Sequence, residues 1–176
     1  RNAGQWLKFT NPVSVITASR VDEVIPALSA VEKQVEKSRF YACGFLSYEA
    51  APAFDSALET CNPGNIPLLW FGFFTAPEYL EVLPLPKKNF TLGDQSFSMK
   101  RRHYGKAISS IKKELLAGNT YQVNLTMHIK GSFAGDPYAC FCELYRHQTS
   151  DNAVFYFDGR KAICSLSPEL FFRLDG

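Results

Sequence analysis

Polar side chains that carry no full charge alternate with apolar ones near the middle of the chain. Residues 120–130 read TYQVNLTMHIK, in which Gln122, Asn124, Thr126 and His128 take even positions while the odd positions are apolar. A period of two is typical of a β-strand with two unlike faces. Amides, hydroxyls and imidazoles can donate and accept hydrogen bonds. The pattern predicts a strand whose polar face binds a ligand, and a plain half-exposed strand is the alternative that alternation alone leaves open.

A helix is predicted on each side of this strand. Residues 102–117 carry apolar side chains at three- and four-residue spacing and end before Gly118, a common helix terminator. We expect this helix to lead straight into the strand. Asp136-Pro137 opens the second helix, with Pro137 at the first helical position, and the helix runs to about His147.

The N-terminal half is predicted to contain several strands and one helix. The strands are expected over residues 11–18, 40–55, 67–75, 79–83 and 95–99. The almost wholly apolar segment 67–75 favours a central strand, and Pro52 closes the strand that starts at residue 40. The helix is expected to use Asp22 as its cap, with Pro26 limiting how early it can begin.

A hairpin is predicted near the C-terminus. Its strands cover residues 153–157 and 162–166, and Asp158-Gly159 is a turn pair. Another strand is expected over residues 170–174. The final pair Asp175-Gly176 also favours a hairpin turn, so we expect a sheet edge whose returning strand is absent.

The predicted fold class is α+β, a mostly antiparallel sheet with helices packed outside. Residues 1–176 are enough for one core and are treated as a single portion, with residues 84–93 as the place of any internal boundary. The five cysteines form no CxxC pair, so neither a disulfide framework nor a zinc site is predicted. The net charge of +2 gives no nucleic-acid footprint, and no apolar run approaches a membrane span. A cytoplasmic protein is expected.

Two motifs carry a resemblance to a known family. Residues 118–126, GNTYQVNLT, followed by Ser167-Pro168-Glu169, resemble the chorismate-utilising enzymes. Residues 44–55, GFLSYEAAPAFD, look like the aminodeoxychorismate branch, and the Leu-Leu-Glu-Ser element of tryptophan feedback is absent. The resemblance covers nearly the whole chain but only the N-terminal portion of the family's catalytic subunit. It implies an incomplete part of the family's layered sandwich.

The resemblance implies roles for four residues. Glu169 matches the general acid that protonates the departing C4 hydroxyl of chorismate, and an apolar cover from Phe171 or Leu166 would favour the protonated form. Gln122 matches the position at which water-adding members carry a lysine base, so its neutral amide favours an aminating enzyme. Asn124 and Ser167 are candidate substrate-binding residues, with ordinary structural hydrogen bonding as the alternative.

The implied activity is that of a transferase that converts chorismate and ammonia to 4-amino-4-deoxychorismate, for p-aminobenzoate and folate synthesis. A glutamine amidotransferase would supply the ammonia. The family's lysine nucleophile and the glutamates that hold Mg²⁺ are expected beyond Gly176, so no metal ligand is expected in this chain, which alone should be inactive. The anthranilate branch is the nearest rival, and a non-catalytic binding or regulatory module is an alternative of another class.

Overall fold

The computed structural model describes residues 5–62 and 64–174. The internal contacts divide the chain into two compact units, Arg1–Leu83 and Pro84–Gly176. Helices and antiparallel strands occur in both units, which confirms the α+β class. The strands of the described residues form four small sheets. None of the helices in the described residues is long and apolar enough to cross a membrane.

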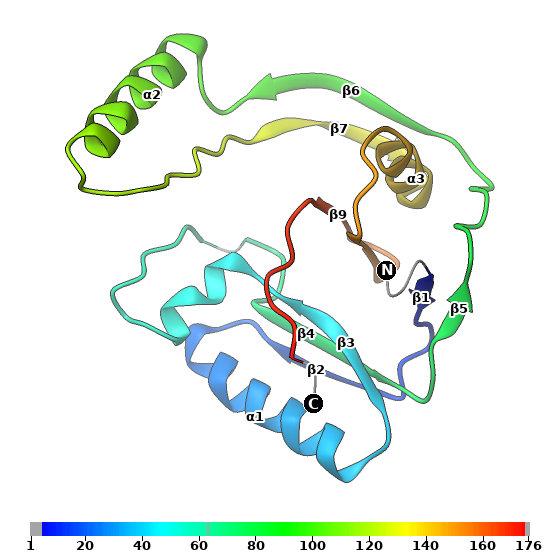
Figure 1. The fold of residues 1–176 in the computed structure, drawn as a ribbon. Helices are drawn as coiled ribbons and strands as arrows, with labels where there is room; N and C mark the ends of the chain where they lie inside the picture. Colours follow the sequence, from blue (N-terminus) through cyan, green and yellow to red (C-terminus); the bar gives the residue numbers. More distant parts are fainter. Residues whose placement is uncertain (1–4, 63, 175–176) are drawn as a thin grey trace. The chain divides into compact units, whose positions relative to one another are not determined.

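The first unit contains a three-stranded antiparallel sheet with β4 in the centre (Figure 1). Its strands are β2 (Ser14–Ala18), β4 (Leu69–Phe74) and β3 (Tyr41–Leu46), in the order β2-β4-β3. The central strand predicted within residues 67–75 is therefore confirmed. A separate pair joins β1 (Trp6–Lys8) to β5 (Glu78–Leu80).

Helix α1 (Val21–Lys37) covers this three-stranded sheet and closes the core of the first unit. Val24 of the helix and Leu69 of β4 are fully buried, and Leu68 is nearly so. Burying an aliphatic side chain of this size stabilises a fold by about 1.5–3 kcal/mol. The apolar positions of α1 thus pack in one core cluster with Ala18 of β2, with Ala50 and with Leu69 of β4.

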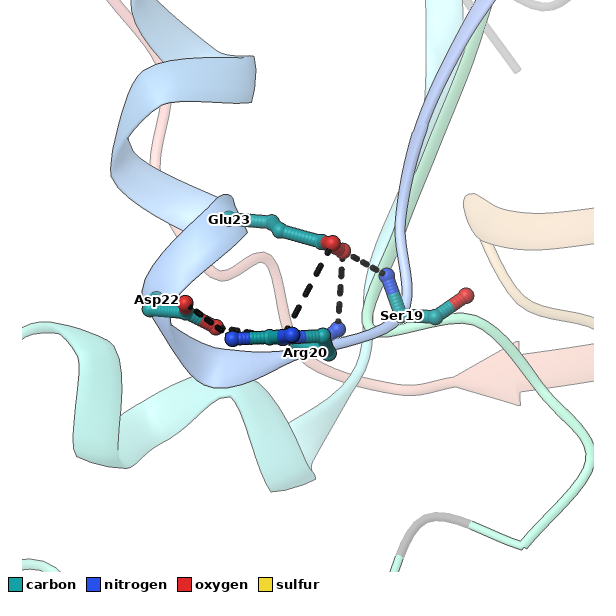
Figure 2. Close-up of polar contacts among 4 residues, drawn as sticks. All are labelled: Ser19, Arg20, Asp22 and Glu23. Carbon is teal, nitrogen blue, oxygen red and sulfur yellow. Dashed lines mark hydrogen bonds and ion pairs between the residues drawn. The ribbon is translucent and has the colours of Figure 1, made fainter.

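The start of α1 differs from the prediction, because Arg20 and not Asp22 is the capping residue. The Glu23 carboxylate accepts hydrogen bonds from the backbone nitrogens of Ser19 and Arg20, at 3.0 and 3.1 Å (Figure 2). Asp22 instead pairs with the Arg20 guanidinium at 2.5 Å. The expectation that Pro26 limits how early the helix begins is also wrong, because α1 begins at Val21 and Pro26 lies inside it. A proline there removes one backbone donor, and the burial of the apolar face maintains the helix around it.

The strand predicted over residues 40–55 ends early. Strand β3 stops at Leu46, and a 3₁₀ helix, η1 (Tyr48–Ala53), follows. Leu46 pairs with Leu69, the first residue of β4, and one further hydrogen bond joins the Ser47 nitrogen to the Leu68 oxygen at 2.9 Å, after which no described strand continues the ladder. A strand needs a neighbour for its backbone groups, and the chain therefore turns at Ser47.

In the part of the second unit that the structure describes, there are two antiparallel strand pairs and two helices. The pairs are β6 (Phe90–Phe97) with β7 (Ile129–Gly135), and β8 (Asn152–Phe157) with β9 (Ala162–Ser167). The helices are α2 (Arg101–Leu116) and α3 (Pro137–His147), both close to their predicted bounds. No residue of α2 is buried.

Helix α3 begins as its sequence predicts. Asp136 caps it, accepting a hydrogen bond from the Tyr138 nitrogen at 2.9 Å, and proline occupies the first turn. Phe141 is 1% exposed, and its ring centroid lies 5.4 Å from that of Phe155 on β8. The aromatic face of α3 thus fixes the helix to the β8–β9 pair.

The predicted hairpin between β8 and β9 is confirmed. The Asp158 carboxylate accepts hydrogen bonds from the backbone nitrogens of Arg160 and Lys161 at 2.8 and 2.7 Å, which lowers the pKa of that carboxyl. Gly159 has a φ of 93°, which a side chain would oppose. This turn returns β9 along β8 and brings Ser167 opposite Asn152.

Candidate active site

The candidate acid lies in a turn directly after β9. The Ser167 hydroxyl donates to the backbone oxygen of Glu169 at 2.7 Å and accepts from its backbone nitrogen at 3.2 Å. Local bonds of this kind hold a turn without a neighbouring strand. The backbone of Glu169 is therefore attached to the last residue of β9.

The side chain of Glu169 is exposed, so the expected apolar cover is absent. Phe171 is 92% exposed, and its ring packs on that of Phe172 with centroids 5.0 Å apart. The strand predicted over residues 170–174 does not form, and the expected turn at 175–176 lies outside the described residues. The apolar pattern of 170–174 meets no partner strand in the described residues, and a strand is not stable by itself.

Ser167 has limited capacity left to bind a ligand. A hydroxyl has one proton to donate and two lone pairs that accept. The turn with Glu169 uses the proton and one lone pair. As a substrate-binding residue, Ser167 could therefore accept one hydrogen bond while the turn stays intact.

Ser150 is linked to the same turn, and sequence reasoning missed it. Its side chain is buried, at 6% exposure. The hydroxyl donates to the backbone oxygen of Ser167 and accepts from the backbone nitrogen of Asn152 at 3.1 Å. A serine within the polar run TSDN has the composition of any loop, so no sequence signal distinguishes it.

Gln122 and Asn124 lie on an exposed segment without regular structure, so the strand predicted over residues 120–130 is wrong for most of its length. Strand β7 begins only at Ile129. Tyr121, one of the apolar odd-numbered residues of the alternating pattern, is 95% exposed.

The physical reason for this difference is the end of the partner strand. Strand β6 stops at Phe97, opposite Ile129, and one further pair of hydrogen bonds joins Ser98 and His128. Beyond that point no strand among the described residues pairs with the segment, and alternation by itself does not form a strand.

The four predicted site residues form two groups. Ser167 and Glu169 share one turn, and Gln122 and Asn124 share one exposed segment. Among the described residues, no hydrogen bond joins the two groups. The roles assigned to these residues stay predictions.

The second unit also has an open hollow of about 620 Å³ near the start of α2. It is lined by Phe97, Met99, Lys100, Arg101, Tyr104 and Met127. None of the four predicted site residues lines it. Three of the side chains that line it, those of Phe97, Tyr104 and Met127, are at least 44% exposed. The hollow is therefore a shallow depression open to solvent and not an enclosed binding site.

The described residues offer no metal centre. No group of three or more His, Cys, Asp or Glu side chains in that part of the chain is placed to hold a metal ion. Carboxylate oxygens are the usual protein ligands of Mg²⁺. The residues present do not fit a magnesium site, and the ligands predicted beyond Gly176 stay a prediction.

The second unit carries a family match. A family model described as chorismate binding enzyme matches residues 77–176, more than half of the chain. The match includes β6 to β9, both helices of the second unit and all four predicted site residues. The chain therefore belongs to the chorismate binding enzyme family.

Curated relatives are similar to the chain over a shorter length. Aminodeoxychorismate synthase component 1 of Escherichia coli (strain K12) is 33% identical over 91 residues, which are 51% of this chain and 20% of that protein. The proteins of the same name from Klebsiella aerogenes and Salmonella typhimurium are 34% and 35% identical over 77 and 78 residues. Each of these two alignments covers 44% of this chain and 17% of the relative. The matched segments thus span about a fifth of the length of these relatives.

Proposed function

We propose that the chain is part of a catalytic subunit that converts chorismate and ammonia to 4-amino-4-deoxychorismate. The observation that carries the proposal is the family match over residues 77–176, with three relatives that share the name aminodeoxychorismate synthase component 1. The product would serve p-aminobenzoate and folate synthesis. A glutamine amidotransferase partner, a magnesium ion held by residues outside this chain and a cytoplasmic location belong to the same proposal.

Glu169 is the proposed general acid for the departing C4 hydroxyl. Its backbone is held in a turn by Ser167, which supports the role by fixing where the side chain starts. The side chain itself is exposed. A carboxyl donates a proton efficiently when water is excluded around it. We propose that further protein covers Glu169 in the working enzyme, and that the 176-residue chain alone is inactive.

Gln122 is proposed to orient the substrate and not to act as a base. An amide side chain offers one oxygen that accepts and two N–H groups that donate, and it does not take a proton at neutral pH. The exposed position of Gln122 leaves these groups accessible to a ligand. Because the amide cannot take a proton from water, Gln122 favours ammonia over water as the added group.

The test is an assay of the protein that carries this chain together with the remainder of the family's catalytic subunit. Chorismate, magnesium and ammonium are supplied, and the products are identified by mass. Glu169→Gln keeps the size of the side chain and removes its acid, so we expect a rate about 10²- to 10⁴-fold lower. Glu81→Gln is the matched control, because it removes an exposed carboxylate from the first unit and should leave the rate unchanged.

The outcomes separate the parts of the proposal. Aminodeoxychorismate from the wild type and its loss in Glu169→Gln support both the reaction and the acid. Anthranilate as the product would overturn the proposed branch. A Glu169→Gln variant with wild-type rate would show that Glu169 is not the acid.

A further inference from the structure

Ser150 is the one polar residue that is buried among the described residues, and both of its hydrogen bonds are to backbone groups. It lies between α3 and β8, and its side chain is 6% exposed. Its hydroxyl accepts from the Asn152 nitrogen at 3.1 Å and donates to the Ser167 oxygen. One atom therefore connects the first residue of β8 to the last residue of β9.

This hydroxyl is the first link of a short series of hydrogen bonds that ends at Glu169. Ser150 holds the carbonyl of Ser167, and the side chain of Ser167 holds the backbone of Glu169 at both its oxygen and its nitrogen. Asn152 and Ser167 are also partners in the β8–β9 register. The position of Glu169 thus depends on a buried anchor at the end of the ladder.

We propose that Ser150 is a positioning residue, which holds the Ser167–Glu169 turn in the orientation that the acid needs. This inference rests on the proposed role of Glu169. The anchor must accept and donate at one point, which a hydroxyl does and a methyl or an amide does not. Loss of the hydroxyl would leave the Ser167 carbonyl without this partner and release the turn.

The effect on catalysis follows from the role of the turn. A small displacement of a catalytic group can lower a rate by about a hundredfold, whereas ground-state binding changes little. We expect Ser150→Ala to lower kcat about ten- to a hundredfold with a nearly unchanged KM. Ser150→Thr keeps the hydroxyl and is expected to restore most of kcat.

A second readout does not depend on activity. In the 176-residue chain, the NMR order parameter of the Glu169 backbone N–H reports the rigidity of the turn. We expect it to fall from about 0.85 to below about 0.6 in Ser150→Ala. Ser109→Ala is the matched control, because it removes a serine hydroxyl that bonds only within α2, to the Gly105 oxygen at 3.0 Å, and should change neither value.

Each outcome decides the inference. A fall in the order parameter and in kcat, both restored by Ser150→Thr, supports it. Unchanged values in Ser150→Ala overturn it, and so does an equal loss in the alanine and threonine variants or a general loss of structure, since these indicate packing or folding. If the wild type forms no aminated product, the proposed function fails, whereas the order parameter still decides whether Ser150 holds the turn.

Discussion

The carboxylate of Glu23 lies 3.1 Å from the backbone nitrogen of Arg20 and accepts its hydrogen bond at the start of α1. The same carboxylate accepts from Ser19 at 3.0 Å, so one side chain satisfies two backbone donors (Figure 2). The first N–H groups of a helix have no partner within it, and a side chain that supplies one stabilises the helix. This contact replaces the cap that the sequence assigned to Asp22.

Glu23→Ala is therefore expected to destabilise the start of α1 by about 1 kcal/mol. The measurement is amide hydrogen exchange at Arg20 and in the first turn of the helix, where protection should fall. Glu32→Ala, in the middle of the same helix and exposed, is the control and should leave that protection unchanged. Equal effects of the two variants would contradict the capping role.

Gly135, at the end of β7, is expected not to tolerate a side chain. Its φ is 104°, and a Cβ there would meet the Asn89 oxygen and lie 2.8 Å from the Phe90 Cα. Both are backbone atoms that cannot rotate away. We expect Gly135→Ala to cost at least about 1–3 kcal/mol through strain and displacement of the start of β6.

Gly105 provides the matched control for this substitution. It lies within α2, and a Cβ there would meet no atom within 4 Å other than its chain neighbours and the nearby backbone of the helix itself. Gly105→Ala should therefore stabilise the helix by up to about 1 kcal/mol. Urea unfolding followed by circular dichroism measures both variants, and a loss of stability in Gly105→Ala or its absence in Gly135→Ala would contradict the expectation.

Tyr138 is expected to make stability fall at high pH. Its hydroxyl donates to the Pro84 oxygen at 2.9 Å. Burial, and then a hydrogen bond with the Cys142 side chain, raise the pKa of Tyr138 well above its usual value of 10.0. The folded chain therefore keeps a proton that the unfolded chain loses above about pH 10, so the stabilisation is complete below that pH and decreases as the pH rises through it.

The measurement is a titration of phenolate absorbance, together with unfolding at several pH values. Tyr138→Phe should lack one phenol that ionises late and should show a shallower loss of stability above about pH 10. Tyr79→Phe is the control. Tyr79 is exposed, so this variant should keep the late ionisation of Tyr138. A Tyr138→Phe titration with that ionisation intact would show that another tyrosine is responsible.

Cys164 is expected to react slowly with alkylating reagents. Burial, and then the neighbouring Cys140 and Cys142, raise the pKa of Cys164 to about 11 from the ordinary 9.0. Its thiolate fraction near neutral pH is then roughly a hundredfold lower than that of an ordinary thiol, and the thiolate is the reactive form. Cys61 is exposed and should be modified first.

Mass spectrometry of the alkylated peptides over time measures this order. Cys61→Ser should remove the fast phase and leave the slow modification of Cys164 unchanged. Early alkylation of Cys164 in the folded wild type would be inconsistent with its burial.

The features that the sequence determined by itself are those set by neighbours in the chain. The helix over Pro137–His147 follows from the Asp136 cap and the proline beside it, and the β8–β9 hairpin follows from Asp158-Gly159. The motifs around Gln122 and Glu169 carried the family resemblance, and the match over residues 77–176 confirms that family. These signals are short in range, so they do not depend on how distant segments meet.

The tertiary structure decided where partners end and which loop residue matters. Residues 120–128 alternate like a strand, yet β6 supplies no partner beyond Phe97, and residues 170–174 likewise remain outside any sheet. Ser150 gains its importance only because the β8–β9 register brings the Ser167 carbonyl to its hydroxyl. A hydrogen bond between distant parts of the chain depends on the position of both groups in space, and residue type and local spacing do not encode that position.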